Sequence, residues 1–177
     1  MAIPLSAKPE AAPKRPWLYE NSDVPMDPAW LFGTLPNGLR YGIRKNGVPP
    51  GQISIRLRVD VGSLMERDDE LGFAHFMEHL TFRGSRHVPD GESKRIWQRL
   101  GVTFGSDSNA QTTPTGTTYA LDLPDATPAT IDESLKILAG MMADPNIVPA
   151  GLWLMTGECA KLPAQAAIRQ SHEDRKS

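Results

Sequence analysis

The sequence has little cysteine, no long apolar run and no excess of charge of one sign. Its single cysteine, Cys159, cannot close an internal disulfide or supply the several thiolates of a cysteine-rich zinc module. No apolar stretch approaches the roughly 20 residues that span a bilayer. Lysine and arginine number 19 against 21 aspartate and glutamate, so the formal net charge of -2 offers no basic footprint for nucleic acid. These absences argue against a membrane span and a nucleic-acid partner, and they leave histidine and carboxylate for any metal site.

The size and composition are those of one ordinary globular domain. The chain has 177 residues, of which 40% are hydrophobic and 23% charged, values close to the averages for soluble folded chains. Residues 1–29 contain several prolines and are predicted to form a flexible leader. The leader lacks the apolar core of a signal peptide. Because such leaders often follow a removed export signal, we expect a periplasmic or exported protein.

The order of predicted elements favours an α+β fold. Asn37-Gly38 between extended residues is a strong hairpin signal, and residues 52–61 alternate apolar and polar side chains with the period of a half-buried strand. No strict alternation of strands and helices follows. We therefore predict a mixed, antiparallel-rich sheet with helices packed on one face. The expected strands are 31–35, 39–45, 52–61, 103–112 and 117–123, and the expected helices are 70–82, 92–100 and 130–142.

The predicted helix over residues 70–82 carries the pattern H-x-x-E-H, formed by His75, Glu78 and His79. At about 100° per residue the two histidines lie about 40° apart, so both imidazoles point the same way and can share one cation. Glu78 lies about 60° further round and can sit beside that cation without binding it. A metal with an open position acidifies water, and a nearby carboxylate can take the proton.

The alternative interpretation of these three residues is that they are ordinary polar side chains on a helix. Most of their neighbours along the chain are apolar, however, and a buried ionisable side chain costs free energy unless something pairs with it. A shared metal ion provides that pairing. Zinc is the expected metal, although manganese or cobalt would suit the same ligands, because selection among these ions depends on availability.

The segment GFAHFMEHLTFRGS, residues 72–85, resembles the signature of the M16 metallopeptidases, the pitrilysin and insulinase family of inverted zincins. The resemblance extends to LPNGLRY in the expected hairpin and to VGSLME before the motif. It also includes LGVTFG, SNAQT and YALDLP in the segments that follow. It covers about residues 30–148, which we therefore expect to form one truncated M16-like α+β domain.

The resemblance implies a zinc endopeptidase in which His75 and His79 bind Zn²⁺ and Glu78 activates water. It also implies that Asn109 and Ala110 lie on an edge strand that pairs with an extended peptide substrate. Such pairing is physically reasonable because main-chain hydrogen bonds bind any peptide backbone. The alternative for Asn109 is a turn or strand-end residue that satisfies its own backbone.

The family takes its third zinc ligand from a glutamate about 75 to 80 residues after the second histidine. In this window Glu158 is the only carboxylate, flanked by Gly157 and Pro163, which disfavour a long helix. Glu158 is therefore either the third ligand or an ordinary surface carboxylate. A second alternative ligand is His87, which would have to bend back toward the metal from the loop after the helix.

The family pattern is lost at about residue 149, and residues 149–177 are predicted to form a divergent tail with the composition of a disordered segment. A truncation, a frame change in the gene or a diverged end could each produce this loss of the family pattern.

Family members pair two related domains around the substrate, so we expect this chain to need a second M16-like domain or partner subunit. Without hydrolysis, the chain would be a peptide-binding or assembly subunit. A purely structural zinc domain fits the ligand types poorly.

Overall fold

The computed structural model describes residues 16, 17 and 19–146, which belong to two compact units divided between Pro50 and Gly51. The predicted tail and Glu158 lie outside the described residues, as does most of the leader. No helix in the described part is both long enough and apolar enough to cross a membrane. The elements are β1 (Trp30–Thr34), β2 (Arg40–Arg44), β3 (Ile53–Val59), the 3-10 helix η1 (Ser63–Met65), α1 (Phe73–Thr81), α2 (Glu92–Arg99), β4 (Ser108–Thr113), β5 (Gly116–Leu123) and α3 (Pro128–Ala143).

The first unit contains the predicted hairpin. Strands β1 and β2 pair antiparallel, with Leu31 opposite Ile43. The turn is closed by hydrogen bonds from the Gly38 N–H to the Leu35 carbonyl at 2.9 Å and from the Leu35 N–H to the Leu39 carbonyl at 2.8 Å. Gly38 has a φ of 89°, which a residue without a Cβ adopts at little cost. The Asn-Gly signal therefore predicted this hairpin correctly.

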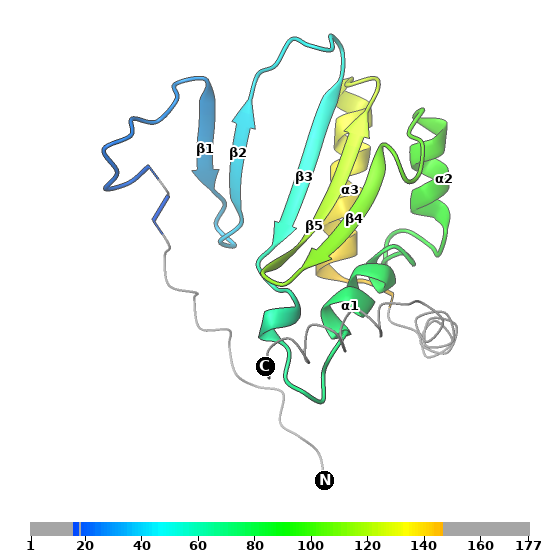
Figure 1. The fold of residues 1–177 in the computed structure, drawn as a ribbon. Coiled ribbons are helices and arrows are strands. Elements are labelled where there is room, and N and C mark those ends of the chain that lie inside the picture. The colour runs from blue at the N-terminus through cyan, green and yellow to red at the C-terminus, as the bar shows by residue number, and fades with distance from the viewer. Residues whose placement is uncertain (1–15, 18, 147–177) are drawn as a thin grey trace. The chain divides into compact units, whose positions relative to one another are not determined.

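The second unit is built on an antiparallel sheet with the strand order β3-β5-β4. The β3–β5 register places Ile55 opposite Leu121 and Leu57 opposite Tyr119, so the apolar side chains of both strands share one face. Helix α3 lies along this face of the sheet (Figure 1), and α2 contributes the buried Trp97 to the same core. The predicted α+β class, with an antiparallel sheet and helices on one face, is confirmed.

The opposite face of β3 and β5 is polar. Asp122 accepts hydrogen bonds from the Ser54 hydroxyl at 2.5 Å and from the Arg56 guanidinium at 2.8 and 3.1 Å. The Arg56 hydrogen bonds hold the pKa of Asp122 below its ordinary value. The alternation in residues 52–61 is thus confirmed, with side chains of opposite character on the two faces.

One predicted strand is too long. The sequence predicts an extended chain throughout residues 103–112, but β4 begins only at Ser108. Asp107 accepts a hydrogen bond from the Thr103 N–H through its side chain, and its own N–H donates to the Thr103 carbonyl. A short aspartate side chain that bonds nearby backbone favours a turn over a strand. Residues 103–107 therefore fold back before the strand starts.

Helix α1 begins three residues later than predicted because Glu66, six residues before Gly72, caps it. The Glu66 carboxylate accepts hydrogen bonds from the Gly72 N–H at 2.8 Å and the Ala74 N–H at 2.7 Å. Gly72 has a φ of 95° and provides no side-chain cap of its own. A carboxylate at this end also interacts favourably with the helix dipole. Asp69 is nearer to the helix start in sequence, but its carboxylate pairs with Arg67 instead.

Replacing Glu66 by alanine is expected to destabilise the protein by about 1 kcal/mol, the usual cost of losing a helix cap. The measurement is the free energy of unfolding in urea. Asp68→Ala is the matched control, because this carboxylate is exposed, and its effect should stay within about 0.5 kcal/mol. Equal losses in the two variants would contradict the capping role of Glu66.

The low pKa of Asp122 predicts a dependence of stability on pH. A carboxyl whose pKa is depressed by folding contributes stability above its unfolded value of about 3.9, and this contribution is lost as the pH falls through the folded pKa. Arg56→Met should raise the Asp122 pKa, as seen by NMR of the carboxyl carbon. Because both side chains are largely exposed, the stability change should be under about 1 kcal/mol. Arg58→Met, which removes the partner of Asp60 instead, should leave the Asp122 pKa unchanged.

Candidate active site

The two histidines of the motif face each other on α1. Their Nε2 atoms are 3.0 Å apart, and the ring centroids are 4.6 Å apart with an angle of 59° between the planes. Two nitrogens that share a tetrahedral zinc ion, at 2.0 to 2.1 Å each, lie about 3.3 Å from each other. The side chains of His75 and His79 are therefore spaced to hold one metal ion after a small adjustment. Both are half-buried, so the cost of burial that favours a shared metal ion applies to the histidines only in part.

Glu78, in contrast, is buried, with only 7% of its surface exposed. Its Oε2 accepts a hydrogen bond from the hydroxyl of Thr112 on β4 at 2.5 Å. A buried carboxylate needs such a donor, because burial without a partner carries a large desolvation cost. The contact joins α1 to the sheet across 34 positions of sequence and fixes the Glu78 carboxylate against β4.

Thr81 at the end of α1 and Tyr119 on β5 form a second polar contact between the helix and the sheet. The Thr81 hydroxyl donates to the main-chain carbonyl of Glu78 at 2.7 Å and also hydrogen-bonds to the Tyr119 hydroxyl at 3.3 Å. Burial raises the pKa of Tyr119, and the negative charge of Glu78 adds to the rise, whereas the Thr81 hydrogen bond opposes it. Tyr119 is therefore a neutral phenol at neutral pH, and its contact with Thr81 joins two uncharged hydroxyl groups.

A third metal ligand is not found among the described residues. Within residues 16, 17 and 19–146 no three histidine, cysteine, aspartate or glutamate side chains are grouped so that they could hold a metal ion. His87 is exposed in the loop after α1 and belongs to no such group. Glu158 lies outside the described residues, so its role stays a prediction.

Asn109 and Ala110 lie on β4, which pairs only with β5 in the described sheet and so forms one of its edges. Asn109 is exposed and Ala110 half-buried. The Asn109 side-chain oxygen accepts a hydrogen bond from the Ala110 N–H at 2.8 Å. This local bond is the one that the alternative interpretation of Asn109 anticipates, and it occurs on an edge strand, as the family resemblance implies.

Sequence analysis missed the functions of Glu66 and Thr112 at this site. Neither residue belongs to the H-x-x-E-H pattern, and both lie outside it in the sequence while contacting the helix that carries it. The alternation along β4 offers a partial signal, since Thr112 falls on the same face of the strand as Ser108 and Ala110. Nothing local in the sequence indicates that this face meets Glu78.

Comparisons of the sequence and of the structure with known proteins point to one family. Residues 46–153 match the model of the insulinase family, peptidase family M16. A probable zinc protease PqqL from Haemophilus influenzae is 33% identical over 132 residues, which are 75% of this chain and 14% of that protein. The chain thus spans a small part of the relatives that it matches.

Solved structures that resemble this chain are also proteases. The first half of the periplasmic protease PqqL from Escherichia coli has a TM-score of 0.71 and 30% identity, covering 77% of this chain and 30% of that one. The ferredoxin protease FusC, solved as a mutant in complex with Arabidopsis ferredoxin, has a TM-score of 0.63 and 32% identity. This match covers 70% of the present chain and 14% of FusC. The chain belongs to peptidase family M16.

Proposed function

We propose that this chain is the catalytic N-terminal part of a zinc-dependent endopeptidase. The observation that carries the proposal is the pair of imidazole nitrogens 3.0 Å apart on α1, with the buried Glu78 directly before His79 on the same helix. This combination supplies two metal ligands and a base that does not itself need to bind the metal. Membership of family M16 supports the same chemistry.

The residues that would hold zinc are His75 and His79, with Glu158 as the proposed third ligand. Two imidazoles and one carboxylate form a donor set typical of catalytic zinc sites, which leave one position open. Zn²⁺ supplies Lewis acidity, which lowers the pKa of nearby water toward 7 and polarises the peptide carbonyl. His87 is exposed in its loop, which makes it a weaker candidate than Glu158.

Glu78 is the proposed general base. Its carboxylate accepts the proton of the attacking water and returns it to the nitrogen of the leaving amine. Thr112 donates to one carboxylate oxygen, which holds the group in one orientation and leaves the other oxygen for the water. Thr112 is thus a positioning residue for Glu78.

The proposed substrate is an extended peptide that adds to the free edge of β4 at Asn109 and Ala110. An added strand can accept the Ala110 N–H in place of the Asn109 side chain, which now holds it. Edge-strand pairing of this kind binds any sequence through the main chain, so pockets for side chains must supply selectivity.

We further propose that a second M16-like domain or partner subunit completes the site and that the protein acts outside the cytoplasm. Enclosure of the substrate excludes water and orients the reacting groups, and both effects accelerate the reaction by orders of magnitude. The periplasmic description of the PqqL relative and the proline-rich leader support export. The complex of FusC with ferredoxin supports a polypeptide substrate for this family.

Zinc content and peptide cleavage test the proposal together. The wild-type chain is expected to bind one zinc ion per molecule and to cleave an unstructured peptide slowly. Glu78→Gln should keep the zinc and lose cleavage by about 100-fold or more. His75→Ala should lose the zinc, as measured by calorimetric titration.

His87→Ala is the matched control and should retain both zinc and cleavage, because this exposed histidine is no ligand in the proposal. Glu158→Ala should weaken zinc binding if Glu158 completes the metal site. Stoichiometric zinc without cleavage, even with a partner domain added, would contradict the enzyme proposal and favour a peptide-binding or assembly subunit. Failure to bind zinc would contradict the metal site itself.

Thr112→Val is expected to lower kcat by about 10- to 100-fold. The loss of a hydrogen bond to a charged group is worth about 1.5–3 kcal/mol, and 1.4 kcal/mol corresponds to a factor of about 10 in rate. KM and zinc affinity should stay unchanged, because Thr112 is proposed to act only through Glu78.

Thr112→Ser should restore kcat, since it keeps the hydroxyl. Thr118→Val is the control on the neighbouring strand, where the side chain points to the opposite face of the sheet. The positioning role would be wrong if zinc affinity fell in step with kcat, or if the serine variant behaved like valine.

A further inference from the structure

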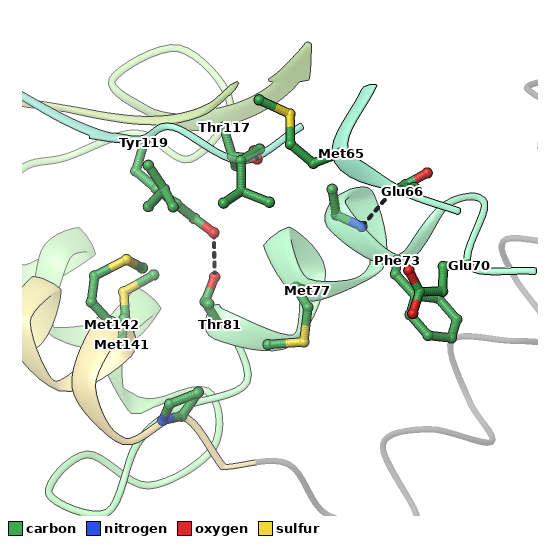
Figure 2. Close-up of a pocket in the computed structure, with 14 residues that line it drawn as sticks. Met65, Glu66, Glu70, Phe73, Met77, Thr81, Thr117, Tyr119, Met141 and Met142 are labelled. Carbon is green, nitrogen blue, oxygen red and sulfur yellow. Dashed lines mark hydrogen bonds between the residues drawn. The ribbon is translucent and has the colours of Figure 1, made fainter. Parts of the chain in front are cut away.

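An apolar cavity of about 440 Å³ lies beside α1, between η1, the ends of β3 and β5, and the end of α3 (Figure 2). Four of the seven methionines of the chain line it, namely Met65, Met77, Met141 and Met142. Methionine is flexible and polarizable, so a surface rich in it adapts to different apolar partners. The cavity therefore has the character of a site for an apolar segment.

This cavity is separate from the histidine pair. Phe73, Met77 and Thr81 follow one another at successive turns of α1 and line the cavity, whereas His75 and His79 lie on another face of the helix. The apolar side chains around it are accessible, with Phe73 58% and Met65 54% exposed. A contiguous exposed apolar patch of this kind marks an interaction surface.

The residues that directly follow α3 lie at the edge of the cavity. Pro145 is one of the lining residues. Asn146 is held in place by its N–H, which donates to the Gly84 carbonyl, and by its side-chain amide, which donates to the Ser85 carbonyl, both at 3.0 Å. Whatever follows Asn146 therefore starts next to the cavity.

The sequence that follows has the composition to fill it. Residues 147–155 read IVPAGLWLM and contain no charged side chain, whereas residues 158–177 contain many. Nine residues reach about 30 Å when extended, which is ample for a cavity that begins at the preceding residue. A tethered segment is also present at an effective concentration of the order of millimolar, so even weak contacts hold it in place.

We propose that residues 147–155 dock into this cavity, with Leu152, Trp153 and Leu154 against the methionines of η1, α1 and α3. An aromatic side chain buries about 150–250 Å², and the exposed Phe73 and Met77 lose their contact with water at the same time. The occupant is the chain's own segment, so docking depends on neither zinc nor cleavage and can be tested without them.

Cys159, the only cysteine, permits a direct test. A nitroxide attached to Cys159 of the full chain should broaden the NMR signals of the labelled methyl groups of Met65, Met77, Met141 and Met142, compared with a diamagnetic label. The distance from Met155 to Cys159 is at most about 14 Å, so a docked segment carries the label close to these methyls. The Ser54 amide serves as the reference signal, because it lies five residues along β3 from the cavity-lining Val59, a separation of about 17 Å.

The double variant Trp153→Asp/Leu154→Asp should abolish the broadening, whereas Ala166→Asp/Ala167→Asp, beyond the segment, should not. A mixture of nitroxide-labelled chains with isotope-labelled Cys159→Ser chains separates the alternatives, because broadening there would mean that a second copy fills the cavity. That result would overturn the proposal, as would absence of broadening in the singly labelled wild-type chain. If the double aspartate variant does not fold, the broadening in the wild-type chain and in the mixture still tests the proposal.

Discussion

The hydrogen bond from the Thr112 hydroxyl to the Glu78 carboxylate joins the motif helix to the edge strand of the sheet, and the geometry of the site depends on it. Burial would strongly penalise Glu78 without a donor, so the bond makes a buried ionisable group tolerable. It also places the proposed base and the proposed peptide-binding strand in direct contact. The proposed base and the proposed substrate edge therefore belong to one connected unit, formed by α1 and β4.

Helix α1 presents different chemistry on each side. One face carries the imidazoles, the flank carries Glu78 against the sheet, and a third face carries Phe73 and Met77 over the apolar cavity. Nine residues suffice because a helix turns about 100° per residue and so separates these functions around its axis. Substitutions on the cavity face can therefore change packing without altering the two histidines.

The sequence predicted the features that depend on local backbone geometry. The spacing of His75 and His79 places both on one face of any α-helix, and Asn37-Gly38 favours one kind of turn. Features that depend on contacts between distant residues were not predictable, such as Thr112 on Glu78 and Glu66 at the start of α1. The turn at residues 103–107 was missed because the Asp107 side chain competes with strand pairing. Glu158 lies outside the described residues and stays a prediction.

Glu66 both caps α1 and lines the apolar cavity. Water that reaches the cavity also reaches this carboxylate and weakens its bonds to the helix by competing for them. Displacing that water lowers the local dielectric and strengthens the same bonds. An apolar occupant of the cavity would thus tighten the first turn of α1, and filling a hydrophobic surface would stiffen the helix that carries the imidazoles.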